Sequence, residues 1–179
     1  MLADAGLVFD VAPADVDEEA LKTPGVDPVE LARTLAEAKA LEVSSRFPGA
    51  VVLGGDRNLA FDGGLVSKAK SLEEARARLR SMRGRAHALH SGAALAQDGR
   101  LLWSGADTAH MVMRDFSDAF LDDYMALEGE AVLASVGAYR LEGPGAQMFA
   151  RVDGDYFTVL GLPLWSVLEA LRQAGVLKP

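Results

Sequence analysis

Four charged residues next to apolar segments have the types that chemistry at a phosphate group requires. Asp56 follows the apolar run 51–53 and two glycines, and Lys68 follows a glycine-rich turn. Lys39 lies in an alanine-rich stretch, and Glu18 belongs to an acidic segment. Carboxylates can hold a divalent cation and position a water molecule, while lysines neutralise phosphate charge. The set is suited to hydrolysis of a phosphoanhydride, although the same residues fit a structural reading in which Asp56 caps a turn and the lysines are solvated.

The stretch VVLGGDRNLA, residues 51–60, begins as a buried strand and then breaks its own pattern. Two glycines, an aspartate and an arginine follow three apolar residues. Because glycine has no side chain, Gly54 and Gly55 would let a ligand approach the backbone closely. We therefore expect the strand to end at Leu53 and Asp56 to lie in the loop that follows.

Helix signals define the elements around these residues. Asp27 precedes Pro28, which predicts a helix with Asp27 as N-cap, Glu30 completing a capping box and Pro48-Gly49 ending the run. Ser71 predicts a second helix that stops at Gly84. Four arginines lie off the apolar stripe of that helix and are expected on a solvated face: Arg76, Arg78, Arg80 and Arg83.

The second half of the chain adds strands and two more helices. The segments 87–97 and 100–114 flank Asp98-Gly99, a strong hairpin signal. A helix is expected from Ser117 to residue 127 and another from 162 to 174, with glycine-rich short strands and loops at 136–161. The predicted fold class is therefore α/β, with a mixed central β-sheet flanked by helices.

Composition limits the partners of this 179-residue chain. The formal net charge of −8 disfavours a nucleic acid or an anionic membrane as partner. The chain has no cysteine, which excludes disulfides, thiolate metal sites and a cysteine nucleophile. No segment reaches the roughly 18 apolar residues needed to span a bilayer, and no basic, apolar leader is present. We expect a compact protein in the cytoplasm.

Common motifs for other chemistries are missing. The sequence contains neither a phosphate-binding loop of the G-x-x-x-x-G-K type nor an H-E-x-x-H zinc motif. His87 and His90 are three residues apart in a predicted strand, so their side chains should lie on opposite faces and share no metal. With His110, they are expected to have structural roles.

Several sequence blocks in a fixed order resemble the Maf family of nucleoside triphosphate pyrophosphatases. The blocks are D-V-D-E at 15–18, L-A-E-A-K-A at 35–40, V-V-L-G-G-D at 51–56, D-G-G-L-V-S-K at 62–68, R-G-R-A-H-A-L-H-S-G at 83–92, G-A-Y-R-L-E-G-P-G-A at 137–146 and D-G-D-Y-F-T-V-L-G-L-P-L at 153–164. They cover nearly the whole chain, which makes their combination far more specific than any single block.

The resemblance implies a fold with two lobes around a cleft and an activity. Members cleave a nucleoside triphosphate between its α and β phosphates, releasing a monophosphate and pyrophosphate with a divalent metal such as Mg²⁺ or Mn²⁺. Asp56 then resembles the base that activates water, Lys39 and Lys68 the phosphate-binding lysines, and Glu18 a residue near the metal or the triphosphate, so Glu18 and Asp56 are the candidate metal ligands. Dimers are common in the family, so a homodimer is an expectation, and some members are linked to septum formation.

Substrate choice in the family depends on the residues that correspond to Arg57 and Glu142. Glu142 resembles the branch that acts on 7-methyl-GTP. A carboxylate can accept two hydrogen bonds from the N1 and N2 donors of guanine and offset the charge of its methylated ring. Arg57 departs from both known patterns and adds a charge that could bind phosphate or pair with Asp56. The expected substrate is a guanine-type nucleotide such as 7-methyl-GTP.

Two further departures leave a second function open. The family begins with a strand and a Ser-x-Ser-x-x-Arg phosphate loop, whereas this chain starts at M-L-A-D-A-G-L, which corresponds to the helix after that loop. Ala69 stands where the family has proline after Lys68, and Lys70 could compete for the role of that lysine. We therefore expect residues 1–179 to form a single domain without that strand and loop. The alternative to an active enzyme is a catalytically impaired module that binds nucleotide or a protein partner.

Overall fold

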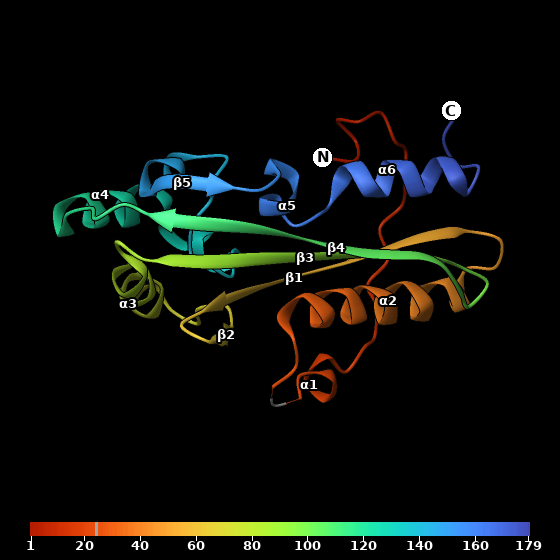
Figure 1. Ribbon diagram of the computed structural model, residues 1–179, viewed down its shortest axis with the longest axis horizontal. Helices are drawn as coiled ribbons and strands as arrows, with labels where there is room; N and C mark the ends of the chain where they lie inside the picture. Colours follow the sequence, from red (N-terminus) through yellow and green to blue (C-terminus); the bar gives the residue numbers. More distant parts are fainter. Residues whose placement is uncertain (24) are drawn as a thin grey trace. The chain divides into compact units, whose positions relative to one another are not determined.

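The computed structural model describes residues 1–23 and 25–179 (Figure 1). Its elements are α1 (Glu18–Leu21), α2 (Pro28–Arg46), β1 (Val51–Phe61), β2 (Gly64–Val66), α3 (Leu72–Met82), β3 (Ala86–Gln97), β4 (Arg100–Met113), α4 (Asp118–Glu128), η1 (Gly129–Ala134), η2 (Pro144–Met148), β5 (Phe149–Asp153), α5 (Tyr156–Leu160) and α6 (Leu164–Gln173).

The chain packs into two compact units, each built from separate stretches of sequence. The first unit comprises Met1–Arg57, His90–Thr108 and Asp155–Pro179, and the second comprises Asn58–Leu89 and Ala109–Gly154. Strands β1, β3 and β4 contribute residues to both units.

The five strands form one sheet in the order β2-β1-β3-β4-β5. Strand β2 is antiparallel to β1, and β5 is antiparallel to β4. The turn between β3 and β4 places Asp98 at φ 50° and Gly99 at φ 72°, the left-handed pair that a two-residue hairpin turn requires. The predicted hairpin and the α/β class, with a central sheet flanked by helices, are confirmed.

In the first unit, helices α2 and α6 cover opposite faces of the strands (Figure 1). Ala94 and Ala96 of β3 pack with α2, whereas Ala93 and Leu95 pack with α6. This alternation follows from the two-residue period of a strand. The side facing α2 is lined by alanines, which lets that helix lie close to the sheet.

Strand β1 does not end at Leu53, so the expected loop at residues 54–57 is wrong. The strand continues through Gly54, Gly55 and Asp56 to Phe61. These residues break an apolar pattern without breaking the strand, because β1 stays extended until Phe61 and pairs with β2 only in its last three residues, Leu59–Phe61.

Gly54 is required for packing against α2. A Cβ at this position would lie 2.3 Å from the carbonyl oxygen of Ala36 and 2.7 Å from the amide nitrogen of Ala40. Gly92 on β3 has the same relation to α2, since a Cβ there would lie 2.2 Å from the carbonyl oxygen of Ala32. Two glycines therefore let the backbone of the helix approach the backbone of the sheet. The expectation that Gly54 makes room for a ligand is replaced by this packing role.

Side-chain caps start the helices where the sequence predicted them. Asp27 accepts hydrogen bonds from the amides of Val29 and Glu30 at the start of α2. Ser71 and Ser117 cap α3 and α4 in the same way. The carboxylate of Glu30 binds Arg33. Of the predicted capping box, the Asp27 half therefore forms, whereas Glu30 binds Arg33.

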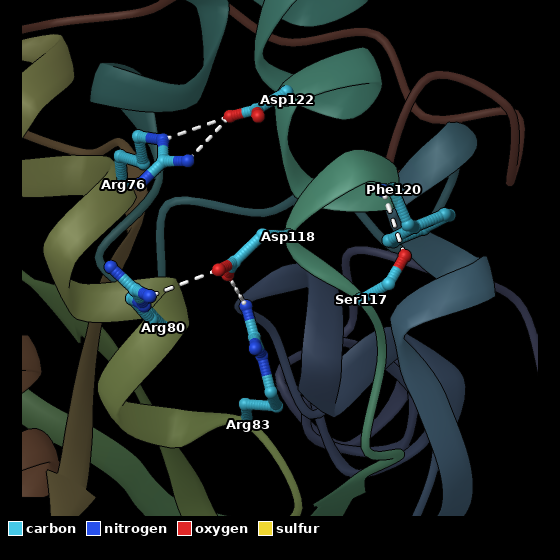
Figure 2. A network of polar contacts seen from close by, with 7 residues as sticks. All are labelled: Arg76, Arg80, Arg83, Ser117, Asp118, Phe120 and Asp122. Atoms are coloured by element: carbon cyan, nitrogen blue, oxygen red, sulfur yellow. Dashed lines mark hydrogen bonds and ion pairs between the residues drawn. The ribbon is translucent and has the colours of Figure 1, made fainter.

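The second unit joins α3 to α4 through a network of ion pairs (Figure 2). Asp122 accepts two hydrogen bonds from Arg76, at 3.0 and 2.5 Å from the Nε and Nη2 atoms. Asp118 accepts from both Arg80 and Arg83. Three of the four arginines predicted on a solvated face therefore bind the neighbouring helix.

The fourth arginine, Arg78, is largely buried, with 11% of its side chain exposed. It donates to the carbonyl oxygen of Val136 and to Glu74. Its burial lowers the pKa of its guanidinium below the ordinary arginine value, against the opposing charge of Glu74. The solvated-face prediction was therefore wrong for Arg78 and for Arg83, which is 19% exposed, whereas Arg80 is 57% exposed. Val136 and Asp118, which these two arginines bind, are distant in sequence and could not be seen as partners.

Residues 1–6 form a turn in place of the expected helix. The amide of Ala5 donates to the carbonyl oxygen of Met1 at 2.9 Å, and the amide of Gly6 donates to that of Ala3. Among residues 1–23 and 25–179, no helix combines the length and the apolar character needed to cross a membrane.

Candidate functional site

Lys39 lies between two carboxylates in the first unit. Its Nζ atom is 2.7 Å from Oε1 of Glu18 and 2.7 Å from Oδ1 of Asp56. Asp56 is the most buried of the three side chains, with 12% exposed, against 21% for Lys39 and 42% for Glu18. The structure thus brings together three of the predicted site residues, with a cation shared by two acids.

Close packing of the helix on the sheet positions Lys39 and Asp56. Gly54 and Asp56 are two residues apart on β1, so their side-chain positions share the face that α2 covers. On α2, Lys39 adjoins Ala36 and Ala40, the two residues that contact Gly54. The glycine contact therefore brings the lysine and the aspartate within hydrogen-bonding distance.

Glu18 reaches Lys39 from α1, a single helical turn. Asp17 caps this turn by accepting a hydrogen bond from the amide of Ala20 at 3.2 Å. The backbone amide of Asp15 donates to Glu42 of α2 at 3.1 Å, which ties the acidic segment to the helix that carries Lys39. The acidic segment is thus partly helical, and it contacts α2 through Asp15 and Glu18.

The two carboxylates keep Lys39 charged. Burial of Lys39 favours the neutral amine, but hydrogen bonds to Asp56 and Glu18 outweigh burial and raise the pKa of Lys39 above its ordinary value. The site therefore offers a fixed ammonium group to an anion such as a phosphate.

The same carboxylates suit a hard divalent cation. Glu18 and Asp56 each place an oxygen within 2.7 Å of one nitrogen, so both can face a single positive centre. Mg²⁺ is commonly held by one or two carboxylates together with water and substrate phosphates. No cluster of three or more histidine, aspartate or glutamate side chains suited to a metal occurs within residues 1–23 and 25–179. The donor set fits a metal that the substrate helps to bind.

Arg57 differs from Asp56 in its surroundings. Its Nη1 atom donates to the carbonyl oxygen of Val159 at 2.7 Å, and its side chain lies against Gly161. Adjacent residues of a strand project to opposite faces, so Arg57 contacts the α5 segment while Asp56 contacts α2.

Lys68 and Glu142 belong to the second unit. Lys68 is exposed in the segment between β2 and α3, and Ala69 beside it is buried. Glu142 has 43% of its side chain exposed and lies 3.4 Å from Nε of Arg140. The guanidinium of Arg140 also contacts Glu128, the last residue of α4.

The buried histidines have the contacts of structural residues. Nε2 of His87 lies 2.6 Å from the hydroxyl of Tyr139, and Nδ1 of His90 lies 2.8 Å from the hydroxyl of Thr108. Burial lowers the pKa of His87 to about 4. His87 is therefore neutral at pH 7.

Sequence reasoning missed Arg140 as the partner of Glu142, and Glu128 as the second partner of Arg140. Arg140 lies only two residues before Glu142 within the G-A-Y-R-L-E-G-P-G-A block, which was a usable signal. Glu128 is more distant along the chain, and its position at the end of α4 gave no sign in the sequence that it would bind Arg140.

Comparison with known proteins shows similarity over nearly the whole chain. A family model described as "Maf-like protein" matches residues 1–174. A 7-methyl-GTP pyrophosphatase of Brucella abortus is 45% identical over 97% of this chain and 89% of its own length. A 7-methyl-GTP pyrophosphatase of Mesorhizobium japonicum is 47% identical, covering 99% of this chain and 91% of its own. A nucleoside triphosphate pyrophosphatase of Caulobacter vibrioides is also 47% identical, covering 99% and 90%.

Proposed function

The chain belongs to the family of Maf-like proteins, and on that premise we propose that it is a nucleoside triphosphate pyrophosphatase. The observation that carries the proposal is the ammonium of Lys39 between the carboxylates of Glu18 and Asp56. A fixed cation beside two acids can bind phosphate oxygens and direct a water molecule. The relatives are named for such an activity.

In the proposed reaction, Asp56 accepts a proton from water while the water oxygen bonds to the α phosphorus. The bond between this phosphorus and the oxygen that bridges to the β phosphorus breaks, and pyrophosphate leaves with that oxygen. Lys39 donates hydrogen bonds to phosphate oxygens, where negative charge is concentrated. Positioning of an in-line water and neutralisation of phosphate charge are the two requirements of such a step.

A divalent cation, Mg²⁺ or Mn²⁺, completes the proposed site. Glu18 and Asp56 would hold it, and when bound it supplies positive charge that polarises the phosphate groups. In the free chain Lys39 lies between the same carboxylates. Substrate phosphates offer Lys39 alternative acceptors. When nucleotide binds, Lys39 can therefore leave the two carboxylates, which then become available to the metal.

The substrate that we propose is a guanine-type nucleotide such as 7-methyl-GTP. Glu142 can accept hydrogen bonds from N1 and N2 of guanine and offset the positive charge of a methylated ring. Two of the relatives above are named for this substrate, and the third is named only for nucleoside triphosphates. Lys68 is the second phosphate-binding cation in this proposal.

Arg57 is proposed to act on substrate binding indirectly. Because its guanidinium binds the carbonyl oxygen of Val159, its contribution to substrate binding is to hold the α5 segment. The protein is further proposed to act in the cytoplasm and to form a homodimer. Light scattering of the purified protein would test the dimer.

The test is pyrophosphate release with Mg²⁺ or Mn²⁺ from 7-methyl-GTP, GTP, dTTP and UTP. We expect turnover of the guanine nucleotides, and a loss of at least about 100-fold in kcat for Asp56→Asn, the size of a missing general base. Asp62→Asn is the matched control, because Asp62 lies in the exposed turn after β1. Equal turnover of dTTP would contradict the guanine preference. Folded protein that binds these nucleotides and hydrolyses none would indicate the binding module instead.

A further inference from the structure

The segment that carries Glu142 is anchored by side chains of three other elements in the second unit. Its residue Ala138 has φ +58°, a conformation that costs energy for a residue with a side chain. The anchoring hydrogen bonds are those from Arg78 to the carbonyl oxygen of Val136 at 2.9 Å, from Tyr124 to that of Ala138 at 3.5 Å, and between His87 and the hydroxyl of Tyr139 at 2.6 Å. The backbone before Glu142 therefore has a defined path.

The backbone of Arg140 is also fixed on the side of Gly145. A Cβ at Gly145 would lie 2.5 Å from the carbonyl oxygen of Arg140, so the two backbones are in close contact. The amide of Gly143 donates to the same carbonyl at 3.3 Å. These contacts fix the backbone of Arg140, and so they limit the positions that its guanidinium can reach.

One guanidinium serves two carboxylates in this loop. Nε of Arg140 lies 3.4 Å from Glu142, and Nη1 lies 3.4 Å from Glu128. Glu128 is nearly buried, with 6% of its side chain exposed, whereas Arg140 and Glu142 are each 43% exposed. Glu128 is thus the buried carboxylate of the pair and Glu142 the exposed one.

We propose that Arg140 is a positioning residue that tunes the preference of Glu142 for a positively charged base, and that Glu128 controls how much of the arginine's charge Glu142 receives. This inference rests on the proposed function, in which Glu142 contacts the base. It adds two residues to specificity, both of which act through Glu142.

Arg140 and Glu128 would act on Glu142 through electrostatics. The 7-methylguanine ring is cationic and guanine is neutral, so a negative charge at Glu142 favours the methylated base over its unmethylated form. Arg140 beside Glu142 cancels part of that charge, and Glu128 draws the arginine's charge away from it. Removal of Arg140 should therefore increase discrimination. Neutralisation of Glu128 should decrease it, because Arg140 then has only Glu142 as an acidic partner within this group of three.

The experiment measures equilibrium binding of 7-methyl-GMP and of GMP by calorimetry at low salt. We expect the ratio of their affinities to rise about two- to fivefold in Arg140→Ala and to fall by a similar factor in Glu128→Gln, the range of a half-exposed ion pair. Arg140→Lys, which keeps the charge, should stay within about twofold of the wild type. Arg151→Ala is the matched control, since Arg151 pairs with Asp153 on β5 and should leave the ratio unchanged.

The opposite signs separate this proposal from simple loosening of the loop. If the two residues had only a structural role, Arg140→Ala and Glu128→Gln would change the affinity ratio in the same direction. That result would overturn the inference. An unchanged ratio in Glu142→Gln would overturn it too, because Glu142 would then not sense the base. Product binding needs no turnover, so a protein that binds with the expected ratios but releases no pyrophosphate would refute the proposed activity and leave this inference supported.

Discussion

The Nζ atom of Lys39 lies 2.7 Å from Oδ1 of Asp56, on the face of the sheet that α2 covers. The lysine comes from a helix and the aspartate from a strand, and Glu18 is the second acceptor of the same ammonium. A cation that is shared in this way restrains two acids at once, and its removal should affect whatever else binds them.

Substitution of Lys39 by methionine should tighten divalent-cation binding in the nucleotide-free protein. The two carboxylates lose their internal cation and become available to an external one. We expect Mn²⁺ affinity, measured by calorimetry or by paramagnetic resonance, to rise about tenfold, or roughly 1.4 kcal/mol. Pyrophosphate release should fall at the same time, because the proposed phosphate-binding group is gone.

Lys22→Met is the control for this measurement. Lys22 forms an exposed pair with Glu19 at 2.6 Å, close to Glu18 in sequence but apart from the shared ammonium. Its substitution should leave Mn²⁺ affinity unchanged. Weaker or equal Mn²⁺ binding by Lys39→Met would mean that Glu18 and Asp56 do not form the metal site.

Gly54→Ala should destabilise the protein far more than Gly55→Ala. The new Cβ at position 54 would collide with backbone atoms of α2 at 2.3 and 2.7 Å, whereas at position 55 the nearest atoms lie at 3.8 and 3.9 Å. Backbone cannot rotate away as a side chain can, so we expect a loss of about 3 kcal/mol or more, at the upper end of overpacking penalties. Urea unfolding measures the difference. Equal stability of the two variants would contradict the packing role of Gly54.

Asp118→Asn should lower the melting temperature more than Asp123→Asn. Asp118 accepts from Arg80 and Arg83 (Figure 2), whereas Asp123 is an exposed acid on the same helix. The hydrogen bond from Arg83 lowers the pKa of Asp118, so its stabilising effect is present above the ordinary aspartate pKa and disappears as acid protonates the carboxylate. The gap between the two variants should therefore close on acidification and shrink in high salt. A gap that persists at pH 2 would exclude an ionic origin.

His87 should make the protein less stable in mild acid. Burial lowers its pKa from 6.5 to about 4 in the folded state. Between these values the unfolded chain binds a proton that the folded chain does not, so stability falls as the pH drops through this window, by up to about 3 kcal/mol. His87→Gln should flatten the fall, measured by urea unfolding at pH 7, 5.5 and 4.5. His110→Gln, at an exposed position, should keep the wild-type profile.

Local signals predicted helices α2, α3 and α4 and the hairpin well. Asp27, Ser71 and Ser117 each cap a helix where expected, because a cap is a contact between near neighbours in sequence. Asp98-Gly99 succeeded for the same reason. Each of these signals is complete within a few residues.

Contacts between distant segments explain the failures. Gly54 resembled a loop residue because the helix that packs on it precedes it by many residues, and no local pattern announces that contact. Arg76 resembled a solvated residue because its partner, Asp122, lies on another helix. At the site, the sharing of the Lys39 ammonium between Glu18 and Asp56 was beyond any spacing argument, because the three residues come from separate segments of the chain.

The glycines at positions 54 and 92 also bear on which substitutions the protein can accept during evolution. Both lie where the backbone of α2 touches the sheet. Any side chain there would push the helix outward and carry Lys39 away from Asp56, even though neither glycine has an atom that takes part in chemistry. In a library of all single substitutions, these two positions should therefore tolerate substitution as poorly as Asp56 itself. The defect would be a longer distance between the Lys39 ammonium and the Asp56 carboxylate.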